Sequence, residues 1–329
     1  MKALLCTRLG TPDVLEVADL PVPRPGPGQI VVEVAYVGLN FHDTLVVAGR
    51  HVVKPDPPFS PGSEYSGVVT AVGDGVQSVA VGDRVVGNEE YGCAREFLLV
   101  RADRVTVLPD GVSDKDAATV LVAYATAYHA LVQRAGLRPG ETLVVLGAAG
   151  GVGSAAVDVG RLLGAEVIAC ASSPERARAA LAQGAGQTLS YGEDGIKERI
   201  KAATAGRGAD VVFDPVGGDV AAAAVRATAW RGRYLVVGFA SGAIPSVGLN
   251  IPMVKGASVV GVFLGEFVRR ERDVHEGNLA RIFAWSRNGD LSPHVHAVLP
   301  LEEGAAALTE LATGQVRGKV LLRVGGRTA

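Results

Sequence analysis

The pattern of hydrophobic and polar residues differs between two parts of the chain. In residues 1–122, short valine-rich segments alternate apolar and polar side chains and are punctuated by Gly and Pro. A period of two predicts strands that bury one face. The expected strands are Ile30–Tyr36, Ser66–Val72, Asp83–Gly87, Glu96–Val100 and Val105–Leu108. This part of the chain is therefore predicted to be a β-rich domain.

From Tyr124 to Phe267 the apolar segments become continuous and alternate with helical patterns. Such runs are typical of strands that are buried on both faces of a parallel sheet. They are expected at residues 142–147, 166–171, 210–214, 234–238 and 257–263. The pattern predicts an α/β fold in which a doubly wound sheet occupies residues 123–266.

The remaining residues, 267–329, show both helical and strand patterns. Helical patterns lie near Leu279–Trp285 and Leu301–Leu311, and a last strand is expected at Lys319–Val324. A short tail with one strand is most easily accommodated by pairing with the first domain, which would then be split into residues 1–122 and 267–329.

The most informative motif for function is GAAGGVG, residues 147–153, which lies between a predicted strand and a predicted helix. Ala148, Gly150 and Gly153 occupy the glycine positions of the G-x-G-x-x-G template. In that context the small residues allow a tight turn, an open approach for a pyrophosphate and close packing of the helix on the sheet. The helix would direct its first N–H groups at the anion. The motif predicts a dinucleotide site, and the alternative is a glycine turn that binds nothing.

The second predicted strand of this domain indicates which dinucleotide is bound. An NAD site usually places a carboxylate at its end for the ribose hydroxyls, but here the strand ends in Ala171, Ser172 and Ser173, followed by Arg176. Two hydroxyls and a cation suit a 2′-phosphate, so we predict NADPH over NADH. The alternative is helix capping, either by a box of Ser172 with Glu175 or by Ser173 before Pro174.

Composition narrows the classes of partner. The 329 residues suffice for two domains, and 48% of them are hydrophobic. Lys and Arg total 32 against 34 for Asp and Glu, so no net basic field favours nucleic acid or an anionic membrane. The N-terminus lacks a signal-peptide pattern, and no uncharged apolar run reaches about 18 residues. We expect a cytoplasmic protein.

Cysteine and histidine positions favour neither a disulfide framework nor a zinc site. Cys6, Cys93 and Cys170 are far apart in the sequence, whereas zinc needs three or four ligands that converge. His42 lies near His51, and His294 alternates with His296 on a predicted strand. No further ligand is visible for either pair, so all four are expected to be structural or solvated.

Seven motifs in order resemble one family over nearly the whole chain: the zinc-independent quinone oxidoreductases, or zeta-crystallin-like proteins, of the medium-chain dehydrogenase/reductase superfamily. The motifs are GLNFHD at 38–43, PGSEYSGVV at 61–69, VGDRVVG at 81–87, AYATAYHAL at 123–131, GAAGGVG at 147–153, DPVGG at 214–218 and GKVLL at 318–322. The resemblance implies a split GroES-like catalytic domain, a Rossmann domain that binds NADPH, and a homodimer formed through the last strand of the Rossmann sheet. Zinc-dependent relatives carry Cys where this chain has Asn40 and His where it has Ser63, so the resemblance implies hydride transfer without a metal.

The resemblance also implies a set of site residues. Asn40 is the candidate donor to the oxygen on which charge develops, with capping of a turn as its alternative role. Asp43 would orient a donor or the ribose, or cap a helix. Glu64 would organise the cleft near the cofactor, and Thr126 would lie near the nicotinamide or serve in helix packing. On the cofactor side the positions are Ala149, Gly150, Gly151, Val152 and Gly153 at the pyrophosphate, Ser172, Ser173 and Arg176 at the 2′-phosphate, Tyr191 over the adenosine phosphate, and Gly238, Phe239, Phe263 and Leu264 around the nicotinamide.

The acceptor is expected to be a small molecule. A quinone is the first choice, because the chain resembles quinone reductases. Many bacterial members line the acceptor pocket with a tyrosine and an arginine where this chain has Leu45 and Val47, so a more apolar pocket and an α,β-unsaturated carbonyl are the alternative. A third alternative is an NADPH-binding structural or interaction protein with little turnover, because a fold alone does not establish an activity.

Overall fold

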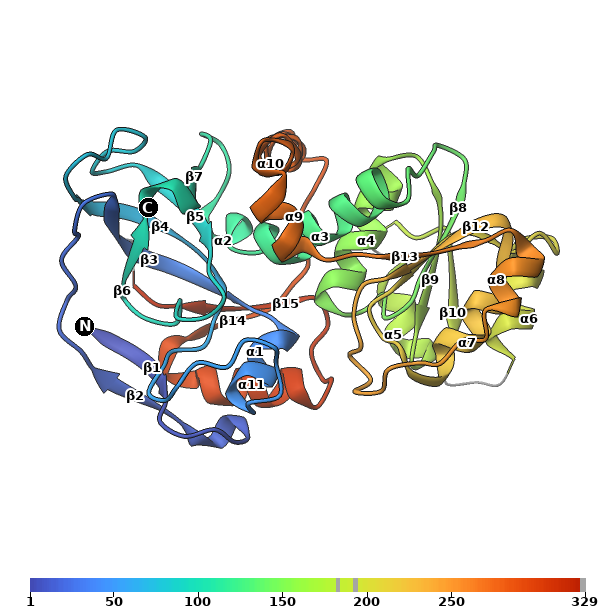
Figure 1. The fold of residues 1–329 in the computed structure, drawn as a ribbon, viewed down its shortest axis with the longest axis horizontal. Coiled ribbons are helices and arrows are strands. Elements are labelled where there is room, and N and C mark those ends of the chain that lie inside the picture. The colour runs from blue at the N-terminus through green and yellow to red at the C-terminus, as the bar shows by residue number, and fades with distance from the viewer. Residues whose placement is uncertain (182–183, 192–194, 326–329) are drawn as a thin grey trace. The chain divides into compact units, whose positions relative to one another are not determined.

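The computed structural model describes residues 1–181, 184–191 and 195–325 (Figure 1). The chain forms two compact units: Met1–Val122 together with Arg281–Ala329, and Ala123–Ala280. In the described part of the chain, no helix combines the length and the apolar character that crossing a membrane requires.

The first unit is built on a mainly antiparallel sheet with the order β14-β15-β3-β4-β5-β7, and β6 pairs with β3. A separate ribbon joins β1 and β2. The strands are β1 (Lys2–Cys6), β2 (Leu15–Asp19), β3 (Gln29–Leu39), β4 (Glu64–Val72), β5 (Arg84–Asn88), β6 (Phe97–Arg101), β7 (Val105–Val107), β14 (Val295–Pro300) and β15 (Lys319–Arg323). The helices are α1 (Phe41–Val47), α2 (Asp114–Ala117) and α11 (Gly304–Ala312), with 3₁₀ turns η1 (Pro12–Val14), η2 (Ala102–Arg104) and η5 (Leu301–Glu303).

The tail strand pairs as predicted from the sequence. β15 lies antiparallel to β3, with Val320 opposite Leu39, and parallel to β14. It is fully buried from Lys319 to Leu322. The C-terminal segment therefore completes the sheet that the N-terminal segment begins, and helices α1 and α11 contact each other (Figure 1).

The central strand β3 carries an irregularity that matters for the site. Ile30, Val32 and Val34 point into the core, as period-two alternation requires, but the next core residues are Val37 and Leu39. The register with β4 shifts between Val34 and Tyr36. A bulge of this kind inserts one residue and reverses the phase of alternation, so the end of β3 is redirected.

The second unit is a doubly wound parallel sheet with the order β10-β9-β8-β11-β12-β13. Its strands are β8 (Thr142–Val145), β9 (Glu166–Ala171), β10 (Gln187–Ser190), β11 (Ala209–Asp214), β12 (Thr228–Val236) and β13 (Ser258–Gly261). Its helices are α3 (Ala125–Tyr128), α4 (Gly151–Leu162), α5 (Pro174–Ala179), α6 (Ile196–Ala203), α7 (Gly218–Arg226), α8 (Asn250–Lys255), α9 (Leu264–Arg270) and the first part of α10 (Arg272–Arg287). Two π-helical turns, η3 (Val120–Tyr124) and η4 (His129–Arg134), flank α3.

The strand order reverses between β8 and β11. Right-handed crossovers then place α4 and α5 on one face of the sheet and α6, α7 and α8 on the other, in agreement with the contacts of α6 with α7 and of α7 with α8. Because helices cover both faces, successive residues of a strand are buried on opposite sides of the sheet. Val144, Ile168 and Val212 pack in one cluster with residues of α6 and α7, and Leu143, Val145 and Val167, which alternate with them, are buried as well. This burial explains the continuous apolar runs in the sequence.

The second boundary between the units differs from the predicted one. Residues 267–280, expected in the first domain, belong to the second unit. The ring of Phe267 stacks on His129 at 3.8 Å, and the side-chain amides of Gln133 and Asn278 exchange hydrogen bonds of 3.0 and 3.2 Å. These contacts hold α9 and the first part of α10 against η4. The second unit therefore continues beyond residue 266, where the pattern of alternating strands and helices in the sequence ends.

Candidate functional site

A buried polar cluster lies where β3, β4 and β15 meet in the first unit. Lys319 Nζ donates to Glu64 Oε1 at 2.5 Å, to Asn40 Oδ1 at 2.6 Å and to the Leu39 carbonyl at 3.1 Å. Asn40 Nδ2 donates to Glu64 Oε1 at 2.9 Å. Lys319 is 2% exposed, Glu64 0% and Asn40 7%. The structure thus brings together two predicted site residues and one that the sequence analysis did not single out.

Local structure explains why these three side chains meet. Glu64 begins β4 opposite Gly38, and Lys319 begins β15 one residue before the partner of Leu39. A Cβ atom on Gly38 would stand 2.2 Å from the Ala118 carbonyl and 2.8 Å from Glu64 Oε1. Glycine is therefore required at position 38 for the carboxylate to reach the end of β3.

The hydrogen bonds of the cluster define what each group can do. Lys319 has three N–H donors and uses all of them, so its ammonium is a fixed positive charge and has no spare proton directed elsewhere. The second oxygen of Glu64, Oε2, accepts from the Val122 N–H at 2.9 Å. The remaining proton of the Asn40 amide faces the Gly38 carbonyl and Ser63 Oγ, both at 3.3 Å. Contacts of that length are weak, so this N–H is the group that a substrate oxygen can take over.

Asp43 serves the backbone of this cluster. Its Oδ2 accepts from the Asn40 N–H at 2.7 Å, and its own N–H donates to the Asn40 carbonyl at 3.0 Å. This is the helix-cap role considered as the alternative for Asp43, and it fixes the start of α1. Asp43 is 1% exposed, and burial raises the pKa of its carboxyl.

Lys319 carried a signal that sequence reasoning can use. Lysine is almost never fully buried unless it is paired, yet this residue precedes the apolar run Val320, Leu321 and Leu322. A charge at the start of a buried strand predicts a buried partner, although it does not identify Glu64.

In the second unit, the predicted cofactor residues gather at the carboxyl edge of the parallel sheet. The glycine turn follows β8, Ser172 follows β9, Tyr191 follows β10, and Gly238 follows β12. The turn after β11 also lies here, because a Cβ on Gly147 would stand 2.8 Å from the Val216 side chain. Doubly wound folds bind ligands at this edge, where the strand order reverses.

The glycine turn has the geometry of a phosphate cradle. Gly147 has φ of +62°, and a Cβ on Gly153 would lie 2.1 Å from the Gly147 carbonyl oxygen. At Gly150 an added Cβ would meet a single atom, at 3.4 Å. Gly150 is the N-cap of α4 and provides no side-chain cap, so the N–H groups of Gly151, Val152 and Gly153 are open to an anion. Ala149 is 4% exposed and packs with Ala171 and Ala177.

The residues expected at the 2′-phosphate divide between two roles. Ser173 is the N-cap of α5, and its hydroxyl accepts from the Arg176 N–H at 3.3 Å. The capping alternative therefore applies to Ser173, whereas the box of Ser172 with Glu175 does not form because the cap lies one residue later. Ser172 is exposed at the edge of the sheet.

Tyr191 connects this segment with the glycine turn. Burial raises the pKa of its hydroxyl, while the Gly147 backbone and the Arg176 charge lower it. Both groups therefore lie near the ring. Tyr191 therefore lies beside the position expected for the pyrophosphate, at the glycine turn, and the position expected for the 2′-phosphate, at Arg176.

The turn after β11 is held by a buried carboxylate that the sequence analysis did not single out. Asp214 Oδ1 accepts from the N–H groups of Val216 at 2.7 Å and Gly217 at 2.9 Å, and Oδ2 accepts from the Tyr234 hydroxyl. A Cβ on Gly217, which has φ of +66°, would press on Phe239 at 2.8 Å. Asp214 thereby fixes the turn against which Phe239 rests.

The other nicotinamide candidates lie at the ends of strands. Phe239 is 37% exposed and Phe263 is 69% exposed, and Leu264 begins α9 directly after Phe263. Thr126 is buried in α3 between the two π-helical turns, and π-helical turns are frequent at functional sites. Asn40, Asp43 and Glu64 thus meet in the first unit, while Thr126 and the cofactor residues belong to the second.

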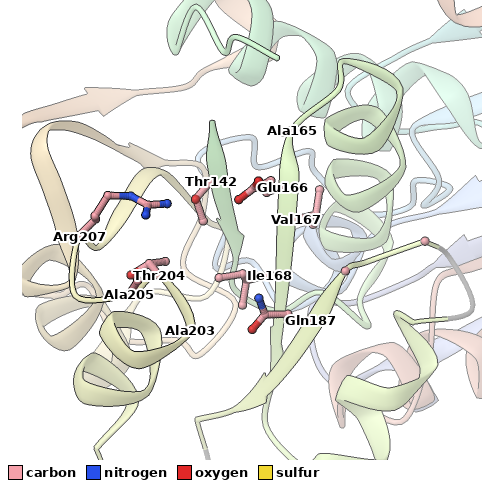
Figure 2. Close-up of a pocket in the computed structure, with 12 residues that line it drawn as sticks. Thr142, Ala165, Glu166, Val167, Ile168, Gln187, Ala203, Thr204, Ala205 and Arg207 are labelled. Atoms are coloured by element: carbon pink, nitrogen blue, oxygen red, sulfur yellow. The ribbon is translucent and has the colours of Figure 1, made fainter. Parts of the chain in front are cut away.

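A hollow of about 420 Å³ lies at the opposite edge of the second sheet (Figure 2). Its lining includes Thr142 and Glu166, which begin β8 and β9, and Thr204 and Arg207, which follow α6. Because it adjoins the amino ends of the strands, the hollow is separate from the cofactor edge.

Among the described residues, no three His, Cys, Asp or Glu side chains form a group that could hold a metal ion.

Comparison with known proteins agrees with this architecture. A family model described as "Alcohol dehydrogenase GroES-like domain" matches residues 26–110, and one described as "Zinc-binding dehydrogenase" matches residues 151–281. The rat protein named quinone oxidoreductase-like protein 2 is 36% identical over 323 residues, which cover 98% of this chain and 91% of the rat protein. The chain belongs to the medium-chain dehydrogenase/reductase superfamily, in its quinone oxidoreductase-like branch.

Two solved structures resemble this quinone oxidoreductase-like protein closely. The Escherichia coli quinone oxidoreductase in complex with NADPH aligns with a TM-score of 0.90 at 28% identity, covering 98% of this chain and 100% of the other. The Thermus thermophilus quinone oxidoreductase, solved also with NADPH, aligns with a TM-score of 0.84 at 35% identity and the same coverage. The first unit of this quinone oxidoreductase-like protein is accordingly GroES-like, and the second is Rossmann-like.

The residues of this quinone oxidoreductase-like protein fit a dinucleotide. The cradle at Gly150 is a space that a Cβ would begin to fill, and the first turn of α4 leaves its donors uncapped. At Asn40 and Ser63 the side chains are an amide and a hydroxyl, and the neighbouring Glu64 carboxylate is already paired with an ammonium. Zinc prefers thiolate, imidazole and carboxylate ligands, so this donor set does not fit zinc.

Proposed function

We propose that this protein is an NADPH-dependent reductase that transfers a hydride to a quinone without a metal ion. The observation that carries the proposal is the Asn40 amide, whose Oδ1 is held by Lys319 and whose Nδ2 is directed by Glu64. A fixed amide donor beside a buried cation can stabilise the oxygen on which negative charge develops.

The contacts of each residue indicate its role in the proposed reaction. When bound, the reduced dinucleotide supplies the hydride. Gly150 leaves room for its pyrophosphate and the first turn of α4 donates N–H groups, while Asp214 fixes the turn that supports Phe239. Lys319 and Glu64 hold Asn40 in one orientation. Such preorganisation lowers the barrier because no group has to rearrange during the reaction.

The proposal is tested by measuring NADPH oxidation with 1,4-benzoquinone, 9,10-phenanthrenequinone and a panel of short enones. We expect the quinones to give the larger kcat/KM. Larger values for enones would reverse the choice of acceptor. NADPH binding without oxidation by any acceptor would instead favour the non-enzymatic role.

One observation supports the enone as a second candidate. Val47 is fully buried and belongs to the core of the first unit, next to the equally buried Val46. A position that many relatives use for a polar pocket residue is therefore apolar and packed in this protein, and an α,β-unsaturated carbonyl needs fewer polar contacts than a quinone with two oxygens.

The preference for NADPH rests on Ser172 and Arg176, with no carboxylate at the end of β9. Fluorescence titration should give a lower Kd for NADPH than for NADH, and Arg176→Gln should raise the Kd for NADPH while leaving that for NADH nearly unchanged. Arg178→Gln is the matched control, since Arg178 lies on the same helix and bonds the Pro174 carbonyl. Equal affinity of the wild type for the two dinucleotides contradicts this part of the proposal.

The absence of a catalytic metal is part of the proposal and is supported by the donor set at Asn40. Elemental analysis of the purified active protein should find zinc far below one ion per chain, and incubation with EDTA should leave the rate unchanged. Stoichiometric zinc that is needed for turnover would refute it.

We further propose a homodimer formed along β13. This strand is the edge of the second sheet, and Val259 on it is 51% exposed. Neighbouring apolar side chains are also exposed, with Met253 at 72%, Leu249 at 82% and Trp230 at 69%. An exposed edge strand with apolar neighbours favours pairing with a second copy of the chain, which sedimentation velocity tests directly.

A further inference from the structure

Beside the Asn40 cluster lies a buried carboxylate oxygen that the cluster does not use. Asp43 Oδ2 accepts from the Asn40 N–H, but Oδ1 is buried and has no hydrogen-bond partner among the residues that the structure describes. Leaving a buried charged oxygen unsatisfied is costly unless an opposite charge lies close to it. The neighbouring group is His42, whose Nε2 lies 3.4 Å from Oδ1.

The His42 ring lies between this carboxylate and the surface. Its side chain is 27% exposed, and its centroid is 5.6 Å from that of His51. In the described part of the chain, the other ring nitrogen, Nδ1, has no hydrogen-bond partner. The ring is therefore anchored on one side by Asp43, and its second nitrogen is left for a further contact.

The charged and titratable groups around the ring come from several segments of the first unit. Asp43 lies beside it on α1, and His51 faces it from the segment that follows. Glu64 and Lys319 act on Asp43 from the far side, and Glu90 acts on His51. Asp43 is the group in direct contact with the ring, since its Oδ1 lies 3.4 Å from Nε2.

Reduction of a quinone by hydride transfer also requires a proton, and the Asn40 cluster cannot supply it. Lys319 has committed all three N–H groups, and an amide such as Asn40 is not an acid. We propose that His42 is the catalytic acid of this reaction and that Asp43 is its positioning residue. This inference rests on the proposed reduction of a quinone.

The step balances as a proton transfer that follows the hydride transfer. A bound reduced nicotinamide dinucleotide would supply the hydride, whose two electrons would convert the quinone into the hydroquinone anion. The Nδ1–H bond of the His42 imidazolium then breaks, and an O–H bond forms on the anionic oxygen. Neutral imidazole remains, with its Nε2–H directed at Asp43, and the partly exposed ring regains a proton from water.

The experiment compares His42→Gln with wild type in single-turnover reduction of a quinone at pH 5.5 to 8.5. We expect His42→Gln to lower the rate about 10²-fold at pH 6, because general acids contribute about 10²–10⁴-fold, while the Kd for NADPH changes less than about twofold. The wild-type rate should fall as the pH rises and the imidazolium is lost, and His42→Gln should lack this fall. Added imidazole should restore activity to His42→Ala.

Two further measurements separate catalysis from folding. In Asp43→Asn the negative charge is lost, so the fall in rate should move to lower pH, and ¹⁵N NMR of the His42 ring should show its titration moving in the same direction. His296→Gln is the matched control, because His296 is 33% exposed and lies 3.9 Å from a carboxylate of Glu310. This variant should behave as wild type.

The possible failures are distinguishable. Wild type that oxidises no NADPH with any quinone overturns the proposed function and the inference with it. Active wild type with an unchanged rate and pH profile in His42→Gln overturns the inference alone. An NMR titration of His42 that is the same in Asp43→Asn as in wild type overturns the positioning role of Asp43.

Discussion

Replacement of Lys319 by methionine tests the buried cluster most directly. Methionine keeps the length and the apolar stem of lysine but removes the ammonium. Glu64 would then keep its donors from Asn40 and Val122 and lose its 2.5 Å ion pair. Asn40 Oδ1 and the Leu39 carbonyl would lose their donors as well.

The expected cost is large because the pair is 2% and 0% exposed. Removing one partner of a buried ion pair costs about 3–5 kcal/mol, since the remaining charge is buried without compensation. A loss of 1 kcal/mol lowers the Tm by about 2–4 °C in a unit of 150–250 residues. We therefore expect the Tm of the first unit to fall by about 6–20 °C.

The assay is thermal unfolding for the Tm and urea unfolding for the free energy, both followed by the fluorescence of Trp285, which is 7% exposed and belongs to the first unit. A Trp230→Phe background removes the signal of the second unit. A double-mutant cycle adds Glu64→Gln and the double variant. The double variant should be more stable than Lys319→Met, because it leaves no unpaired charge. Lys2→Met is the control, since it breaks a 2.6 Å ion pair with Glu302 at the surface and should affect stability far less.

Two results would refute this reasoning. The first is a loss in Lys319→Met no greater than in Lys2→Met. The second is additivity of the two single variants in the cycle, which would mean that Lys319 and Glu64 do not stabilise each other.

Three further predictions concern the second unit. Burial raises the pKa of Asp158 to about 6, so between about pH 4 and pH 6 the folded state keeps a proton that the unfolded state has lost. The free energy of unfolding should therefore fall by about 3 kcal/mol as the pH rises through that window. Asp158→Asn should remove this fall, as measured by urea unfolding at each pH. Gly153→Ala would place a Cβ 2.1 Å from the Gly147 carbonyl oxygen, and the displaced turn should raise the Kd for NADPH at least about tenfold by fluorescence titration. Val259→Lys should convert the proposed dimer into monomers in sedimentation velocity.

Each of these predictions has a contrary outcome. A pH profile of stability that is the same in Asp158→Asn and wild type contradicts the first. Gly277→Ala, where an added Cβ meets nothing within 4 Å, should bind NADPH normally, and an equal loss in both glycine variants contradicts the second. Val52→Lys, at an exposed valine of the first unit, should leave the dimer intact, and a dimer that persists in Val259→Lys contradicts the third.

The sequence predicted the elements that local patterns specify. Alternation located β3, β4, β5 and β6, and continuous apolar runs located most of the parallel strands. It did not predict β10, because Gln187–Ser190 has a single strongly apolar residue, or the start of β12, where Arg231 and Gly232 interrupt the apolar pattern. Burial by neighbouring elements decides such segments, and a local window does not contain that information.

The candidate site likewise combines residues with a local sequence signature and residues that only the fold brings together. The glycine motif has a local signature, so the turn at Gly150 was predictable. Glu64 and Lys319 are 255 positions apart, and no spacing rule connects them. The Asp43 contacts were predictable in part, since Asn40 and Asp43 have the spacing of a helix cap, whereas the contact with His42 depends on the rotamers of both side chains.

The pairing of β15 with β3 has a consequence for synthesis of the chain. The second unit is one continuous segment, so it can fold as soon as residue 280 has left the ribosome. The first unit cannot finish until Lys319 arrives to neutralise Glu64. A nascent or truncated chain that stops short of that strand holds an uncompensated carboxylate in its interior, and chaperones and proteases would meet the protein in that state.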